Sequence, residues 1–136
     1  MPTDRTQVGL PAEAGAQLIQ LKEDTPFFTE EADVYRLSVA VALAKRVALS
    51  EGLLQTQVTT KFRTVMTSAS GEENLPRLDS ADRRLARLVE LFYPDAVGQP
   101  YRYSQYLATI GISFLHGELI GRGRSLYEVI SELENS

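Results

Sequence analysis

The sequence predicts a mainly α-helical fold: a small single-domain bundle of about five helices, with a minor β element near residues 57–67 as an option. Three observations support this. Apolar residues recur at spacings of three and four along several segments. Helix-capping and helix-ending residues separate those segments. The chain has 136 residues, 43% of them hydrophobic and 24% charged, which is enough for one folded core.

The N-terminal end is expected to stay outside this bundle. Residues 1–12 contain two prolines and few apolar side chains, so they predict a flexible tail before a single helical domain over 13–136. The first helix is expected over 13–22, with Leu18 and Leu21 on its apolar side. Pro26 then interrupts the helical pattern.

A central helix is expected over 29–48, with Thr29 as its N-cap. The segment 37–44 is apolar on nearly every face, which is typical of a helix buried on several sides. Acidic residues occupy the first turn, where the helix dipole favours them: Glu30, Glu31 and Asp33.

The segment 57–67 is rich in Thr and Val and alternates in the manner of a strand. Asp79 or Ser80 is expected to cap the next helix, which ends before Pro94 and carries Leu85, Leu88, Val89 and Phe92 as its apolar stripe. A long helix follows over 101–120. Ser125 and Glu128 form a capping-box pattern before a last short helix.

Composition restricts the chemistry and the compartment. The chain has no cysteine, which excludes disulfides, thiolate metal sites and cysteine nucleophiles. No apolar run approaches the roughly 20 residues that span a bilayer, so we predict a cytoplasmic protein without a membrane partner. The net charge of −4 argues against strong non-specific binding of nucleic acid but does not exclude a local basic patch.

No catalytic or metal-binding set emerges from the motifs. His116 is the only histidine, and His116-Gly117-Glu118 matches half of a zinc-deaminase motif whose other half requires cysteines. We therefore interpret it as a structural, half-buried histidine. The acids of 30–33 resemble part of a magnesium site, but helix-start electrostatics explain them. We predict no catalytic residue, no metal and no cofactor.

The segment between the last two helices is a candidate anion site. Its glycines and helix start present backbone N–H groups, and its arginines add charge: Gly121, Arg122, Gly123, Arg124 and Ser125. The alternative, which we favour, is a plain helix end, turn and cap. A DNA-reading role for the last helix is disfavoured because that helix is acidic.

Two further groups are candidate surfaces. A basic set predicts a DNA-binding or partner-binding surface, with a solvated and salt-bridged face as the alternative: Lys61, Arg63, Arg83, Arg84 and Arg87. An aromatic and basic cluster predicts an interface, since such residues are enriched in binding hot spots: Tyr101, Arg102 and Tyr106. Its tyrosines, with Tyr103, fit a core position equally well.

The order of these features resembles the DNA phosphorothioation-associated family, small accessory proteins encoded beside Dnd-type DNA sulfur-modification genes. The resemblance covers about residues 18–133 and rests on four groups of positions: Asp24–Phe28; Asp33–Leu37 with Ala40, Leu43 and Ala44; Asp82, Leu85, Leu88 and Leu91; and Gly117–Leu119 with Leu126–Leu133. It implies a role near DNA modification, restriction or antiphage defence, and it carries over no catalytic residue.

Three functions follow as hypotheses. The first is a non-enzymatic accessory or adaptor protein of a bacterial DNA-modification and defence system, acting through contacts with a protein partner. The second is a DNA-binding module that uses the basic set. The third is a small nucleotide-binding protein or hydrolase with 121–125 as its anion site. A homo-oligomer is compatible with each of them.

Overall fold

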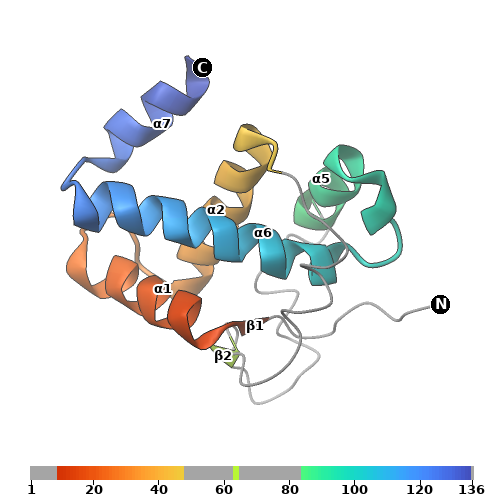
Figure 1. The fold of residues 1–136 in the computed structure, drawn as a ribbon, viewed down its shortest axis with the longest axis horizontal. Helices are drawn as coiled ribbons and strands as arrows, with labels where there is room; N and C mark the ends of the chain where they lie inside the picture. Colours follow the sequence, from red (N-terminus) through yellow and green to blue (C-terminus); the bar gives the residue numbers. More distant parts are fainter. Residues whose placement is uncertain (1–8, 48–62, 65–83, 136) are drawn as a thin grey trace.

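The computed structural model describes residues 9–47, 63–64 and 84–135. Within them the chain is mainly helical, which confirms the predicted fold class (Figure 1). The elements in chain order are β1 (Gly9–Leu10), α1 (Ala12–Asp24), α2 (Glu31–Lys45), β2 (Arg63–Thr64), α5 (Arg84–Phe92), α6 (Pro100–Leu115) and α7 (Leu126–Glu134). A 3-10 turn (Pro94–Ala96) precedes α6, and a π-helical turn (His116–Gly121) follows it.

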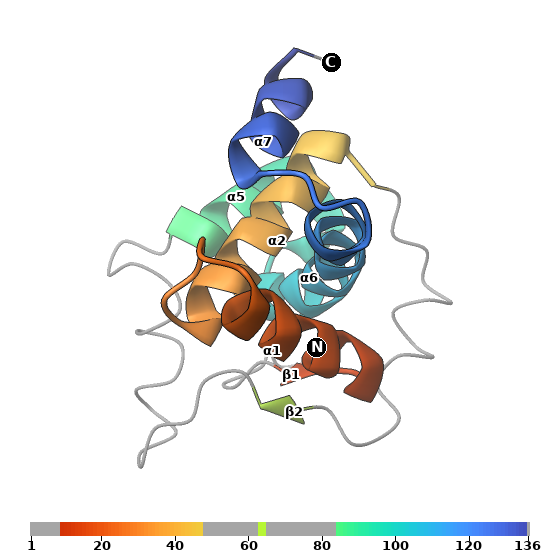
Figure 2. The same ribbon diagram turned by 90° about the vertical axis from the view of Figure 1, so that its left-hand side faces the viewer.

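Helices α2 and α6 cross at the centre, and α1 and α5 pack beside them (Figures 1 and 2). The predicted central helix is α2, and it is indeed buried on several sides: Val34, Tyr35, Val39 and Ala42 are fully buried. Fully buried residues of α6 include Leu107, Ala108, Ile112 and Leu115. The helices approach closely at Gly111, where an added Cβ would lie 1.9 Å from the carbonyl oxygen of Ser38.

The start of α2 differs from the prediction, because the N-cap is Glu30 and not Thr29. The carboxylate of Asp33 reaches back and accepts a hydrogen bond from the backbone N–H of Glu30 at 3.1 Å. Asp33 therefore fixes the helix start one residue later. The helix ends at Lys45 because Arg46 takes a left-handed conformation with φ of 52°.

A small antiparallel β pairing lies beside α1, with Gly9 opposite Thr64 and Leu10 opposite Arg63. It places residues 63–64 of the predicted 57–67 element in a strand, while the rest of that segment lies outside the described residues. Leu10 is fully buried, so residues 9–12 belong to the fold, unlike the expected tail. Residues 1–8 lie outside the described part.

The C-terminal helices follow the predicted order. The expected cap of α5 at Asp79 or Ser80 lies outside the described residues. The long helix expected over 101–120 is α6, and its last turn widens into the π-helical turn. Ser125 caps α7 as predicted, through its hydroxyl and the N–H of Glu128. Among the described helices, none is both long and apolar enough to cross a membrane.

Candidate functional site

The candidate anion segment is held by the chain's own carboxylates. Arg124 donates to Glu118 at 2.9 Å and to Glu132 at 2.5 Å, and Arg122 lies 3.3 Å from Glu118. The hydrogen bond from Arg124 lowers the pKa of Glu118. The hydrogen bonds to Glu118 and Glu132 together raise the pKa of Arg124. The positive charge of the turn is therefore matched within the molecule.

The backbone groups of this turn are also engaged. The N–H of Arg122 donates to the carbonyl of Gly117 at 2.9 Å, and that of Arg124 to the carbonyl of Glu118 at 3.0 Å. The N–H and hydroxyl of Ser125 bond to the Glu128 carboxylate at 3.3 and 3.0 Å. Hydrogen bonds from Ser125 lower the pKa of Glu128. This geometry fits the plain helix connection and not an anion site.

His116 has a structural partner, as expected. Its Nε2 lies 2.7 Å from Oε1 of Gln20, so the pair joins the end of α6 to α1. Asp33, one of the acids considered for magnesium, pairs with Arg36 in addition to capping α2. Across 9–47 and 84–135, no group of three or more His, Cys, Asp or Glu side chains could hold a metal ion.

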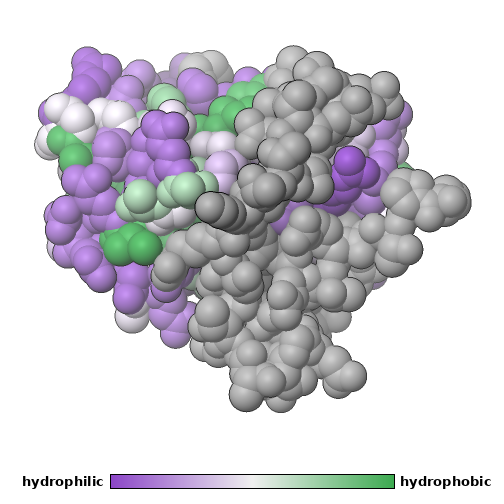
Figure 3. Space-filling view, turned by 60° about the horizontal axis from the view of Figure 1, so that its bottom comes forward, coloured by the Kyte–Doolittle hydropathy of each residue, from purple (hydrophilic) through white to green (hydrophobic). Residues whose placement is uncertain are grey.

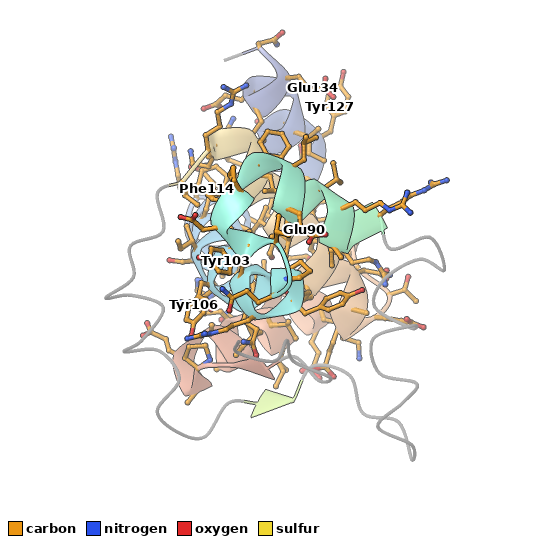
Figure 4. All side chains as sticks on the ribbon, turned by 90° about the vertical axis from the view of Figure 1, so that its right-hand side faces the viewer. Glu90, Tyr103, Tyr106, Phe114, Tyr127 and Glu134 are labelled. Carbon is orange, nitrogen blue, oxygen red and sulfur yellow. The ribbon has the colours of Figure 1, made fainter. Side chains whose placement is uncertain are left out.

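The predicted aromatic interface is wrong for its two tyrosines. Tyr101 and Tyr106 are buried, as is Tyr103, because most residues of α6 lie in the core. Figure 4 labels Tyr103 and Tyr106 among the side chains. Arg102 is half-buried, and its Nη1 donates to Gln99 Oε1 at 3.3 Å. The core alternative is therefore the one that holds.

The basic set divides between described and undescribed residues. Arg84 and Arg87 lie exposed on α5, whereas Lys61 and Arg83 lie outside the described residues and Arg63 is described by its backbone alone. The apolar stripe predicted for this helix is only partly in the core. Leu88 and Phe92 are 45% and 43% exposed, because α5 buries a narrower strip that is centred on Ala86 and Val89.

Helix α5 thus presents a mixed apolar and basic surface. Leu91 is 74% exposed and lies four residues from Arg87 and three from Leu88, so the three share one side of the helix. We use "α5 face" for Arg84, Arg87, Leu88 and Leu91. A different view of the molecule shows the hydrophobic residues of the described part as small, separate patches among hydrophilic ones (Figure 3).

A second surface was not predicted from the sequence. An apolar groove of about 270 Å³ runs between α2 and α7, lined by Leu37, Ala40, Val41, Ala44, Ile130, Leu133 and Glu134. It joins a hollow of about 520 Å³ at Ala44 and Leu133. Lys45, Arg46 and Arg124 line that hollow, and Lys45 Nζ lies 4.3 Å from the ring centroid of Phe114. The sequence did contain a signal for this surface, because the segment 37–44 is apolar on nearly every face. One side of α2 therefore keeps the exposed Ala40 and Ala44 beside its buried residues.

Comparisons with known proteins identify no relative: no family model, curated protein or solved structure matches the chain. The similarity to the DNA phosphorothioation-associated family therefore stays a prediction from the sequence. The surfaces above are the basis for assigning a function.

Proposed function

We propose that this chain is a non-enzymatic accessory protein that acts through protein contacts, and that the α5 face binds its partner. One observation carries the proposal: a nine-residue helix exposes two leucines beside two arginines. Leucine exposed to this degree gains from burial, at about 25 cal/mol per Å² of apolar surface removed from water. An isolated monomer gains nothing from that arrangement.

The chemistry of the partner follows from the face. Burial of Leu88 and Leu91 favours apolar side chains opposite them, and the exposed Arg87 favours an acid nearby. We therefore expect an amphipathic segment of another protein that carries acidic residues beside an apolar stripe. Duplex DNA would engage the arginines alone, because phosphate contacts do not use exposed leucines.

The resemblance supplies the setting of this proposal, a bacterial DNA-modification and defence system of the phosphorothioation type. The acidic balance of the chain agrees with a role beside DNA-acting proteins rather than on DNA itself. The nucleotide-binding alternative is weaker, since the amides of Arg122, Arg124 and Ser125 already have partners within the chain.

The test measures binding of the chain to each purified protein of a DNA phosphorothioation system by biolayer interferometry. Leu91→Ser and Arg87→Glu should each weaken the complex by about fivefold to thirtyfold. This corresponds to about 1–2 kcal/mol, the usual cost of losing an important interface residue. Val97→Ser is the matched control, because Val97 is 66% exposed but lies outside α5. It should leave binding unchanged.

Three results would overturn the proposal. The first is that none of these proteins binds the chain, and the second is that the α5 variants bind as tightly as the wild type. The third is salt-sensitive binding to duplex DNA that Arg87→Glu abolishes and Leu91→Ser leaves intact, which would make the chain a DNA-binding module. The DNA measurement uses phosphorothioate-containing and unmodified duplexes, so that it also shows whether any DNA binding depends on the modification.

A further inference from the structure

The hollow of about 520 Å³ has the size of a small-molecule site. Figures 1 and 2 show the end of α2 and helix α7 at the same end of the bundle, and residues of both helices line the hollow. Part of the lining is apolar, from Ala44, Val129 and Leu133. The rest is mainly charged, so the hollow can contact both the polar and the apolar part of one ligand.

The charge of this hollow is positive, although the whole chain has a net charge of −4. Three cations line it, Lys45, Arg46 and Arg124, against one acid, Glu132. Arg124 is already paired with Glu132 and with Glu118. Lys45 and Arg46 are exposed and form no ion pair within residues 9–47 and 84–135. Two positive charges at the hollow are therefore not matched by an acid of the described chain.

Arg46 occupies a backbone position that ordinarily suits glycine. Its φ of 52° is left-handed, and no other non-glycine residue of the described ranges has a positive φ. Helices often end in this conformation with glycine, because glycine has no Cβ to clash. The preference for cations near a helix C-terminus accounts for Lys45 in the last turn, but it does not account for arginine in place of glycine. A strained position that places a charged side chain at a hollow is typical of ligand sites.

Lys45 is held at the same hollow by an aromatic ring. Its Nζ lies 4.3 Å from the centroid of Phe114, and this cation–π contact restrains the ammonium without neutralising it. The guanidinium of Arg46 has a planar fork that matches two oxygens of a phosphate, while Lys45 supplies a point charge. Val129 and Leu133 beside these cations favour a ligand with an apolar part rather than a bare ion.

We propose that the hollow binds a phosphate monoester of a small organic molecule, with its phosphate on Lys45 and Arg46 and its organic part on Val129 and Leu133. Such a phosphate carries a charge of about −1.5 to −2 at neutral pH, which matches the two unpaired cations. The site differs from the turn 121–125, whose arginines are paired with the chain's own carboxylates. Arg124 forms a wall of the hollow. The proposal is independent of the α5 face.

Titration of the full chain with phenyl phosphate, followed through the amide chemical shifts in NMR spectra, tests the site. The amides of residues 44–46 and 129–133 should shift, and added salt should weaken the binding. Inorganic phosphate and phenol are the matched probes, because each lacks one half of phenyl phosphate. Each should bind several times more weakly than phenyl phosphate does.

Arg46→Gly is the decisive variant, because glycine suits the left-handed backbone and the change removes the guanidinium. It should weaken the binding of phenyl phosphate by about tenfold or more, while urea unfolding shows a protein about as stable as the wild type. Arg87→Gln is the matched control, since it removes the same charge from an exposed position of α5. It should bind phenyl phosphate as the wild type does.

Four results would overturn the proposal. Phenyl phosphate could leave the amides of 44–46 and 129–133 unshifted, or Arg46→Gly could bind it as tightly as the wild type. An equal loss in Arg87→Gln would show general attraction of anions instead of a site. Equal affinity for inorganic phosphate would refute the contact of the organic part with Val129 and Leu133.

Discussion

The crossing of α2 and α6 at Gly111 can be tested by a single methyl group. In Gly111→Ala the new Cβ would lie 1.9 Å from the carbonyl oxygen of Ser38, and 2.6 and 2.8 Å from its C and Cα atoms. Favourable contacts between heavy atoms begin near 3.5 Å. The obstacle is backbone on both sides, so no side-chain rotation relieves the overlap. The two helices must separate by about 1 Å or more.

Two effects of opposite sign decide the result. Alanine in a helix interior is favoured over glycine by about 1 kcal/mol. Overpacking a close contact costs about 1–3 kcal/mol, and a rigid backbone obstacle places this case at the upper end. We therefore expect Gly111→Ala to lower the free energy of unfolding by about 2 kcal/mol, which moves the urea midpoint down by about 1–2 M.

Urea unfolding followed by far-UV circular dichroism measures this change. Gly117→Ala is the matched control, because an added Cβ there meets no atom within 4 Å. It should be neutral or stabilise the fold by up to about 1 kcal/mol. A Gly111→Ala protein as stable as the wild type, or a Gly117→Ala protein destabilised equally, would refute the close crossing.

Two further predictions concern buried and capping hydrogen bonds. The Tyr35 hydroxyl lies 2.6 Å from Ser104 Oγ, which itself donates to the Tyr101 carbonyl, so Tyr35→Phe should cost about 1–2 kcal/mol in urea unfolding. Hydrogen bonds from Ser125 lower the pKa of Glu128 in the folded protein. The ionised carboxylate therefore stabilises α7 at pH values above the ordinary glutamate pKa of about 4.3. This contribution is lost as the pH falls through the lowered pKa of the folded state. In Glu128→Gln, amide exchange in α7 should lose this part of its pH dependence, and an unchanged profile would contradict the capping role.

Local motifs in the sequence were predicted well because their causes are local. The Ser125 cap and the buried middle of α2 each follow from residues within two turns of one another. Thr29 failed as a cap because Asp33 reaches back to Glu30 instead, and both alternatives share the same acidic stretch. Sequence alone does not distinguish a cap from its neighbour when several candidates adjoin.

Contacts between segments far apart in the chain could not be predicted from the sequence. The apolar stripe of α5 was expected to be core, yet Leu88 and Phe92 are substantially exposed, because among the described residues the helix buries a narrow strip centred on Ala86 and Val89. Tyr101 and Tyr106 show the opposite case. The periodicity of the sequence fitted a core position and an interface position equally well, and the structure buries both side chains in the core. The groove beside α7 depends on the angle between two helices, which no periodicity encodes.

Arg124 explains why the candidate anion site and the groove are parts of one arrangement. Its two carboxylate partners lie on different elements, Glu118 on the π-helical turn and Glu132 on α7. A guanidinium that bridges them restrains the direction in which α7 leaves α6, because its planar fork holds two acceptors in fixed positions. Glycines and arginines between two helices predict an anion site, but the same residue types also build a plain helix connection. Here the anions are internal, and their effect is to tie α7 to the π-helical turn that precedes it.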